Sequence, residues 1–279
     1  LAPLFAALAV DGSVRRRLYA AVFATLVTLA VCAPWTARNC VRMHRCALVS
    51  VNAGWNLLIG EATENGAWQP IDVPPECTTV WGEADKDRCF EHAARERIAH
   101  DPLRFLGKAR RKLGATFDYF GGAPWYLHES NPVAFPDAAK LWLGVVETLA
   151  SRAFLLGAIY VVARRGAAGR AEIARHAWAA CAVVAMAFAL TPHAAVVAYV
   201  LLALLLLAAA WPWLPEEMLL PWTAFVILAT AVTHAAFFGA GRYGLVVAPF
   251  VAAVSLLGGR RSPMPALASE SLMDSSSSD

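Results

Sequence analysis

The chain has 279 residues, of which 58% are apolar and 16% are charged, with a formal net charge of +3 and a mean hydropathy of +0.50. A soluble domain carries about 25% charged residues, and its apolar residues recur as a periodic stripe. Here the apolar residues come in blocks, which excludes an ordinary soluble domain. The small, evenly spread positive charge argues against a nucleic-acid partner. We predict an all-α polytopic membrane protein that has the lipid bilayer as a partner.

Six apolar segments predict about six transmembrane helices. Several are shorter than the ~20 residues that an upright helix needs to cross a bilayer, so we expect some helices to include interfacial residues. The nearly continuous run over 177–214 is divided at Thr191-Pro192-His193, because one straight helix of that length would overshoot the bilayer. The segments are Leu18–Trp35, Leu141–Ala163, Ala177–Leu190, Ala194–Leu214, Leu219–Phe238 and Leu245–Leu257.

Three clusters of basic residues set the expected orientation of these helices. Six crossings place all three clusters on one side of the membrane, and the positive-inside rule makes that side cytoplasmic. We therefore predict a multi-pass protein of the bacterial inner (plasma) membrane. The clusters are Arg15–Arg17, then Arg164, Arg165, Arg170 and Arg175, then Arg260 and Arg261.

Four regions follow from this topology. Residues 1–35 hold a partial span and the first full transmembrane helix, and residues 36–140 form an extracytoplasmic domain. Residues 141–258 form a transmembrane helix bundle, and residues 259–279 form a disordered cytoplasmic tail rich in Ser and acidic residues. The chain opens on an apolar run too short to span a bilayer and has no initiator Met, so we expect the N-terminal half of the fold to be missing.

The middle of the extracytoplasmic region, over 83–120, predicts two helices separated at Asp101-Pro102, an N-cap followed by a first-turn residue. The second helix has a basic amphipathic pattern, which is typical of a helix lying on an anionic bilayer. The alternative is a specific role in holding a lipid-linked phosphate. Leu103, Leu106, Leu113 and Phe117 share one face, and Lys108, Arg110, Arg111 and Lys112 surround it.

Four of the six cysteines fall in the extracytoplasmic region. An even number of cysteines in an oxidising compartment predicts two disulfides, most simply Cys40–Cys46 and Cys77–Cys89. A zinc site that includes His44 is the alternative, but the spacing Cys-x3-His-x-Cys matches no common zinc module, and we predict no metal site. His92 is the other nearby histidine. Free thiols are the third alternative, for a compartment that stays reducing.

Residues 239–244 read GAGRYG, which formally matches G-x-G-x-x-G. The motif joins two apolar segments and follows no predicted strand, so we predict a tight external turn and no dinucleotide fold. The turn would carry His234, Arg242 and Tyr243 at the membrane face. Arg suits the binding of a lipid phosphate because it stays charged and offers a planar donor fork. The alternative is an interfacial anchor whose head group reaches water.

Arg38 and Asn39 follow Pro34-Trp35, which marks the end of the first full apolar segment. In the six-span topology Arg38 lies on the same side of the membrane as Arg242. We therefore expect the two guanidinium groups to converge on one phosphate-sized site. The alternative is that both residues are ordinary interfacial anchors.

Glu147 and Arg152 resemble an ion pair within one apolar segment. Five residues separate them, which places them about 140° apart around a helix. We therefore assign them no joint role.

Four stretches, in this order, resemble the C-terminal half of bacterial GT-C membrane glycosyltransferases: APWTARN, VNAGWNLLIG, ERIAHDPLRFLGKARRKL and THAAFFGAGRYGLVVAPF. The similar enzymes are the protein-mannosyltransferase-like and aminoarabinose-transferase-like ones, which use polyprenyl-phosphate sugars. The similarity covers most of 34–257, and the order of the motifs carries it. The chain departs from the family pattern at Ala53, where a Gly is common, at Glu61, where an Asn is common, and at Gly244, where a second Arg is typical.

The resemblance implies transfer of a sugar from a polyprenyl-phosphate carrier to an unidentified acceptor at the outer face of the membrane. It also implies a donor-phosphate site and a loop near that site. The site would contain Arg38, Asn39, Lys112, His234, Arg242 and Tyr243, and the loop would contain Asn52, Trp55, Asn56 and Gly60.

In such enzymes the acidic general base lies in a loop of the N-terminal half, so no catalytic residue carries over to this chain. We expect Glu61, Glu64 and Asp72 to be solvated loop residues. No cofactor is predicted for this chain, and a divalent metal would belong to the full-length enzyme. The alternative function is a non-catalytic membrane scaffold, or a transport-related protein of the same fold.

Overall fold

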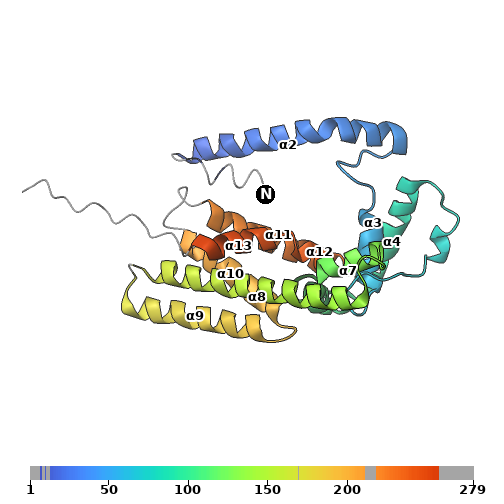
Figure 1. The fold of residues 1–279 in the computed structure, drawn as a ribbon. Helices are drawn as coiled ribbons and strands as arrows, with labels where there is room; N and C mark the ends of the chain where they lie inside the picture. The colour runs from blue at the N-terminus through green and yellow to red at the C-terminus, as the bar shows by residue number, and fades with distance from the viewer. Residues whose placement is uncertain (1–6, 8–9, 11–12, 169, 211–217, 258–279) are drawn as a thin grey trace, which may run out of the picture.

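The computed structural model describes residues 7, 10, 13–168, 170–210 and 218–257 (Figure 1). Long apolar helices run side by side, and shorter helices gather at one end of them. The described residues contain no strand, only one isolated parallel bridge between Ala67 and Gly239. The predicted disordered tail over 259–279 and the basic pair Arg260-Arg261 lie outside the described residues.

Four helices are long and apolar enough to cross a membrane, which indicates a membrane protein. Two shorter apolar stretches accompany them. The first turn of the first long helix, which contains Arg15, and the last turn of the second, which contains Arg164, lie at the same end of the molecule (Figure 1). The four long helices are α2 (Val14–Met43), α8 (Asp137–Ala167), α9 (Glu172–Leu190) and α11 (Leu219–Ala236), and the shorter stretches are α10 (Ala195–Ala210) and α12 (Gly241–Gly244) with α13 (Ala248–Leu256).

The long apolar run is divided where the sequence predicts. α9 ends at Leu190 and α10 begins at Ala195, and between them His193 adopts a left-handed backbone with φ of 60°. α10 then lies at the centre of the bundle, where Leu202 and Leu206 are fully buried. It packs against α8, α9 and α11, as expected for a helix that is apolar on every side.

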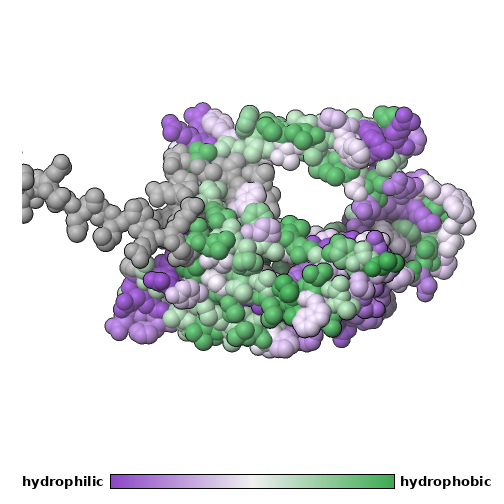
Figure 2. Space-filling view, in the orientation of Figure 1, coloured by the Kyte–Doolittle hydropathy of each residue, from purple (hydrophilic) through white to green (hydrophobic). Residues whose placement is uncertain are grey.

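α2 lies apart from the bundle. No residue of its most apolar window is buried, and an open space separates it from the bundle in the space-filling view (Figure 2). The predicted boundary at Pro34-Trp35 is not the end of this helix, because the helix continues through Pro34 to Met43. It ends where His44 takes a left-handed conformation with φ of 50°.

A return loop, residues 44–52, folds back along the end of α2. The buried Asn39 amide donates to the carbonyls of Ala47 (3.0 Å) and Val49 (3.2 Å). The Trp35 indole N–H donates to the same Val49 carbonyl at 2.6 Å. A disulfide between Cys40 and Cys46 closes the loop. Side chains of α2 therefore satisfy backbone groups that a loop would otherwise leave to water.

α3 (Ala53–Ala62), the 3₁₀ turn η1 (Pro75–Cys77) and α4 (Glu83–His100) form a small cluster with its own apolar core. The predicted loop over residues 52–60 is therefore mostly helix. The buried carboxylate of Asp87 accepts from the Trp55 backbone N–H at 3.0 Å and from Arg45 at 2.9 Å. A second disulfide joins Cys77 to Cys89. The core consists of Leu58, Cys77, Phe90, Ala93 and Ala94.

Three short helices, α5 (Pro102–Gly107), α6 (Ala109–Phe117) and α7 (Gly122–Ser130), connect the cluster to the bundle. The Asp101 carboxylate caps α5 by accepting from the Arg104 backbone N–H at 2.9 Å, as the sequence predicts. The single second helix expected here is wrong, because the chain breaks at Lys108 into α5 and α6. This break splits the predicted apolar face: Leu103 and Leu106 are exposed, whereas Phe117 is buried against the bundle.

We predict that Gly239→Ala destabilises the fold. A Cβ at this position would lie 2.0 Å from the backbone oxygen of Lys112, so backbone would have to move, at a cost of about 1–3 kcal/mol in the free energy of unfolding. Gly114→Ala is the matched control: no heavy atom lies within 4 Å of its new Cβ, and Ala is the better helix former. Thermal unfolding in detergent measures both. Equal stability of the two variants would contradict the contact between the turn and α6.

Candidate functional site

The GAGRYG turn lies flat on α6 at one end of the bundle. The Gly239 backbone N–H donates to the Gly66 carbonyl at 2.8 Å, and the Trp68 N–H donates to the Gly239 carbonyl at 3.2 Å. A Cβ at Gly244 would lie 2.3 Å from the Thr116 carbonyl oxygen. The glycines thus allow the close approach of backbone to backbone. The α11–α12 connection thus contacts two distant parts of the chain, the segment that follows α3 and the body of α6.

Three of the predicted phosphate-site residues meet at this turn. The rings of His234 and Tyr243 stack with their centroids 4.0 Å apart. The exposed guanidinium of Arg242 donates to the Tyr243 hydroxyl at 2.8 Å and lies over the Tyr126 ring at 5.6 Å. His234 is buried and its Nδ1 lies 2.8 Å from the Phe238 carbonyl oxygen. His234 therefore supports the turn from below, while Arg242 faces outward.

A cavity of about 440 Å³ opens beside Arg242. We call it the outer chamber. Burial raises the pKa of Tyr119 above its ordinary value, with a further contribution from Tyr126, so its phenol remains a hydrogen-bond donor at neutral pH. Aromatic faces with a few convergent polar groups are typical of a pocket that binds a small organic ligand. The side chains that line it are Trp68, Tyr119, Trp125, Tyr126 and Arg242.

Lys112 does not face this chamber. Its side chain is fully buried, and its ammonium donates to the carbonyls of Ala236 (3.1 Å) and Ala235 (3.3 Å) at the C-terminal end of α11. Lys108 likewise turns inward and donates to the Glu61 carbonyl at the end of α3. Lysines suit these positions because the last carbonyls of a helix lack intrahelical partners and carry partial negative charge. The prediction that this basic helix presents its lysines to lipid is therefore wrong for both residues.

The three acidic residues that were predicted to be solvated, Glu61, Glu64 and Asp72, differ in their burial. Glu61 is buried, with its carboxylate 3.5 Å from Arg97 and 4.0 Å from the Lys108 ammonium. The prediction that Glu61 is a solvated loop residue is therefore wrong. Glu64 is exposed, but a hydrogen bond from Arg104 and another from Lys108 hold the pKa of its carboxyl below the usual value. Asp72 is exposed, as expected.

The structure does not bring Arg38 and Asn39 to the turn. Arg38 lies over the Trp35 ring at 4.8 Å and donates to the Asn39 side chain at 3.3 Å. The amide of Asn39 is used by the return loop. The end of α2 lies apart from α12 in Figure 1. The expected convergence of Arg38 with Arg242 is thus absent, because Arg38 is held on its own helix.

The four predicted loop residues also lie away from the outer chamber. Asn52 accepts from the Ser50 hydroxyl at 2.6 Å ahead of α3. The Trp55 ring packs on Phe90 with centroids 4.9 Å apart, in the core of the small cluster. Asn56 lies half-buried on α3. Gly60 permits close contact of α3 with the α11–α12 connection, since a Cβ there would lie 2.7 Å from the Phe237 backbone.

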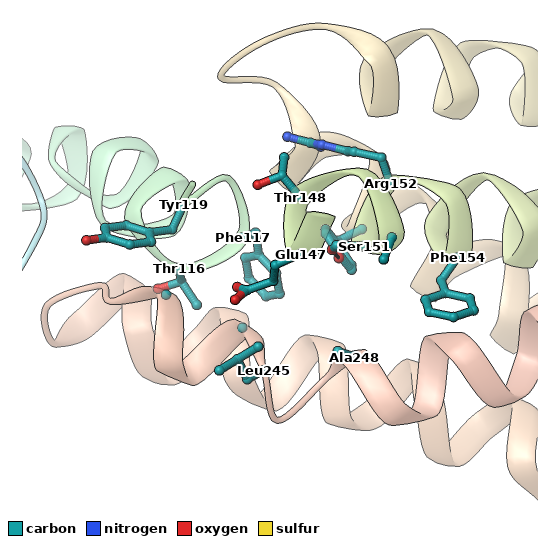
Figure 3. Close-up of a pocket in the computed structure, with 14 residues that line it drawn as sticks. Thr116, Phe117, Tyr119, Glu147, Thr148, Ser151, Arg152, Phe154, Leu245 and Ala248 are labelled. Atoms are coloured by element: carbon teal, nitrogen blue, oxygen red, sulfur yellow. Dashed lines mark hydrogen bonds between the residues drawn. The ribbon is translucent and has the colours of Figure 1, made fainter. Parts of the chain in front are cut away.

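A second cavity, of about 200 Å³, lies between α8 and α12–α13 (Figure 3). We call it the inner chamber. Its polar side chains are Thr116, Tyr119, Glu147, Thr148, Ser151, Arg152 and Tyr199. Glu147 accepts from the backbone N–H groups of Gly122 (2.8 Å) and Ala123 (3.0 Å), which fixes the start of α7. Arg152 pairs instead with Asp118, so Glu147 and Arg152 form no pair, in keeping with their spacing.

Two buried polar atoms at the inner chamber have no partner among the described residues: Thr148 Oγ1 and Arg152 Nη1. An unsatisfied buried donor costs about 1–3 kcal/mol.

Sequence reasoning missed most of the residues that line the two chambers. One local signal was present: DYFGGAPWY over 118–126, which follows α6 and includes the first turn of α7, contains four aromatic side chains and an aspartate. Aromatic residues crowded into a polar region are a usable indication of a binding surface. Trp68 had no comparable signal, since it reaches the chamber only through the Ala67–Gly239 bridge.

Comparisons with protein-family models, with curated proteins and with solved structures find no match to this chain. The function therefore has to be inferred from the two chambers and the residues that line them.

We predict a pH-dependent contribution of Lys112 to stability. Burial, and then the neighbouring Lys108, lower the pKa of Lys112 to about 8 from 10.5. Between these values the unfolded chain binds the proton and the folded chain does not, so the free energy of unfolding rises with pH. The free energy of unfolding of the wild type minus that of Lys112→Met should therefore rise by about 1–3 kcal/mol from pH 8 to 10.5. This gain should be lost as the pH falls through 8. Thermal unfolding of both proteins across this range measures it, and a flat difference would contradict it.

Proposed function

We propose that this chain is a membrane glycosyltransferase, or part of one, that transfers a sugar from a polyprenyl-phosphate carrier to an acceptor at the outer face of the membrane. The observation that carries the proposal is the outer chamber: four aromatic side chains surround a cavity with one arginine at its edge. The aromatic faces suit the apolar faces of a sugar ring, and the guanidinium suits a phosphate. The resemblance of the sequence motifs to GT-C enzymes points the same way.

Arg242 is suited to bind an anion because no carboxylate competes for it. Its described partners are the Tyr243 hydroxyl and the aromatic rings of Tyr243 and Tyr126, and it forms no ion pair within the described residues. Aromatic faces hold the side chain in place while leaving its hydrogen-bond donors available. A charge-assisted contact to phosphate would contribute on the order of 1.5–3 kcal/mol.

The arrangement of the helices supports a topology in which the outer chamber faces the extracytoplasmic side. In this topology α2, α8, α9, α10, α11 and α12–α13 make six crossings of a bacterial inner membrane. Arg15 and Arg164 then lie at the cytoplasmic end, and the outer chamber lies at the opposite end, with residues 36–140 outside.

We predict that Arg242→Ala weakens binding of polyprenyl phosphate roughly ten- to a hundredfold, the loss of one charge-assisted contact. Arg242→Lys should recover only part of the affinity, because Lys lacks the planar fork. Binding is measured on protein in nanodiscs doped with polyprenyl phosphate. Arg88→Ala, an exposed arginine on α4 that lines neither chamber, is the control and should bind as wild type does. Unchanged binding by Arg242→Ala would overturn the donor site and leave a non-catalytic scaffold as the better account.

We predict that a membrane-impermeant maleimide labels Gln69→Cys in intact cells but labels Ala168→Cys only after the membrane is opened. Gln69 follows Trp68 at the outer chamber, whereas Ala168 follows α8 at the opposite end of the bundle. The free cysteines Cys32 and Cys181 are replaced by Ser in both variants. Labelling of both positions from the same side would exclude the six-crossing topology.

A further inference from the structure

A third cavity, of about 680 Å³, lies where α6 meets the turn between α9 and α10. We call it the lateral groove. Its volume falls within the range of about 300–1,000 Å³ that is typical of ligand sites. Gly107 and Gly114 line it, and a Cβ added at either glycine would have no heavy atom within 4 Å, so the groove is open along α5 and α6. The polar side chains that line it are those of Asn65, Arg110, Arg111, Asp118, Tyr119 and His193.

The charges that line the groove leave Arg110 without a counterion. The carboxylate of Asp118 pairs with Arg152 and also accepts from the Ala195 backbone N–H at 3.3 Å. Arg110 is exposed and forms no ion pair or side-chain hydrogen bond among the described residues, so its five N–H donors are available. The exposed imidazole of His193 likewise has no partner in the described part of the chain, and it can donate from one ring nitrogen even when neutral.

The surface next to Arg110 has an excess of positive charge. The exposed carboxylate of Glu64 accepts from Arg104 at 2.5 Å and lies 3.1 Å from the Lys108 ammonium. Arg111, which lines the groove, approaches the same carboxylate at 3.8 Å. Three cations thus share one carboxylate, and a net positive charge remains beside the unpaired guanidinium. A ligand with a net negative charge would be attracted to this surface.

Exposed apolar side chains flank the groove. Phe120 lines it and is 51% exposed, and Leu106, directly before Gly107, is 64% exposed. Leu190, the last residue of α9, is 68% exposed. α9 is long and apolar enough to cross a membrane, and it lies at the edge of the bundle in Figure 1. The groove therefore lies near the end of a candidate membrane span, the level at which basic side chains meet lipid head groups.

We propose that the lateral groove binds the head group of an anionic phospholipid of the surrounding bilayer. The phosphate lies against Arg110, and the acyl chains extend along α9. Val183 and Leu190, both exposed and seven residues apart, share one apolar face of that helix. A lipid bound here fastens α6 to the membrane surface beside the α9–α10 turn. The inference requires that α9 crosses a bilayer and does not rest on the sugar transfer proposed above.

The test uses phosphatidylcholine nanodiscs that contain photoactivatable phosphatidylglycerol, with photoactivatable phosphatidylcholine as the matched probe. The two probes share their acyl chains, photoreactive group and phosphodiester, but only phosphatidylglycerol has a net negative charge. We expect phosphatidylglycerol to crosslink to chymotryptic peptides of α6 and the α9–α10 turn at least about fivefold more than phosphatidylcholine does. Arg110→Gln should reduce the phosphatidylglycerol crosslink about fivefold, the effect of one exposed charge pair, and so bring the two probes level.

A second pair of variants changes the charge of the groove without replacing Arg110. Gly114→Glu places a carboxylate one turn after Arg110, where it would pair with the guanidinium and repel an anion, so the preference should be lost. Gly114→Gln has nearly the same shape without the charge and should keep the preference. Both changes put a better helix former into open space, so neither should lower the unfolding midpoint. Arg88→Gln on α4, an exposed arginine that does not line the groove, should crosslink as the wild type does.

Equal crosslinking of the two probes by the wild type, or a preference that survives Gly114→Glu, would overturn the lipid site. Excess inorganic phosphate or glycerol phosphate should not compete, and competition by either would replace the lipid with a soluble anion.

The same preparation separates this groove from the donor site at the outer chamber. Arg242→Ala should leave the phosphatidylglycerol crosslink intact. If Arg242→Ala also leaves polyprenyl phosphate binding unchanged, the donor site is overturned while the groove stands. Displacement of phosphatidylglycerol from α6 by polyprenyl phosphate would instead assign the groove to the carrier and overturn its assignment to a bilayer phospholipid.

Discussion

The close contact of the GAGRYG turn with α6 organises this end of the molecule. Gly239 and Gly244 allow the two backbones to meet, and the buried ammonium of Lys112 closes the C-terminal end of α11 directly beside them. The bridge from Ala67 to Gly239 then attaches the segment after α3 to the same point. Both chambers border this junction, because Gly241 of the turn lines each of them. A motif that resembles a nucleotide loop is used here for packing.

Much of the architecture follows from local patterns in the sequence. Blocks of apolar residues predict the long helices, and the polar break near Pro192 predicts the division of α9 from α10, because neither depends on distant parts of the chain. The cap at Asp101 is equally local. The grouping of Arg242 and Tyr243 with His234 also follows from sequence, since the three residues lie within one short connection between two helices.

The remaining features depend on tertiary contacts that no local pattern encodes. A basic amphipathic stretch does not reveal that Lys108 and Lys112 turn inward, because their partners are carbonyls at the ends of helices distant in the chain. The pairing of Asp118 with Arg152 spans two helices. Arg38 shows the opposite case: the topology allowed it to approach Arg242, but contacts with its own neighbours hold it on α2. Side-chain direction, more than helix position, is where sequence reasoning fails here.

The wall shared by the two chambers has a thermodynamic consequence. Tyr119 and Gly241 face both spaces, so a ligand that shifts the Tyr119 ring changes the volume and the hydrogen bonding that the other ligand meets. Linkage makes this coupling reciprocal: the factor by which one ligand alters the affinity for the second equals the factor by which the second alters the affinity for the first. A single aromatic side chain would thereby couple the contents of the two spaces.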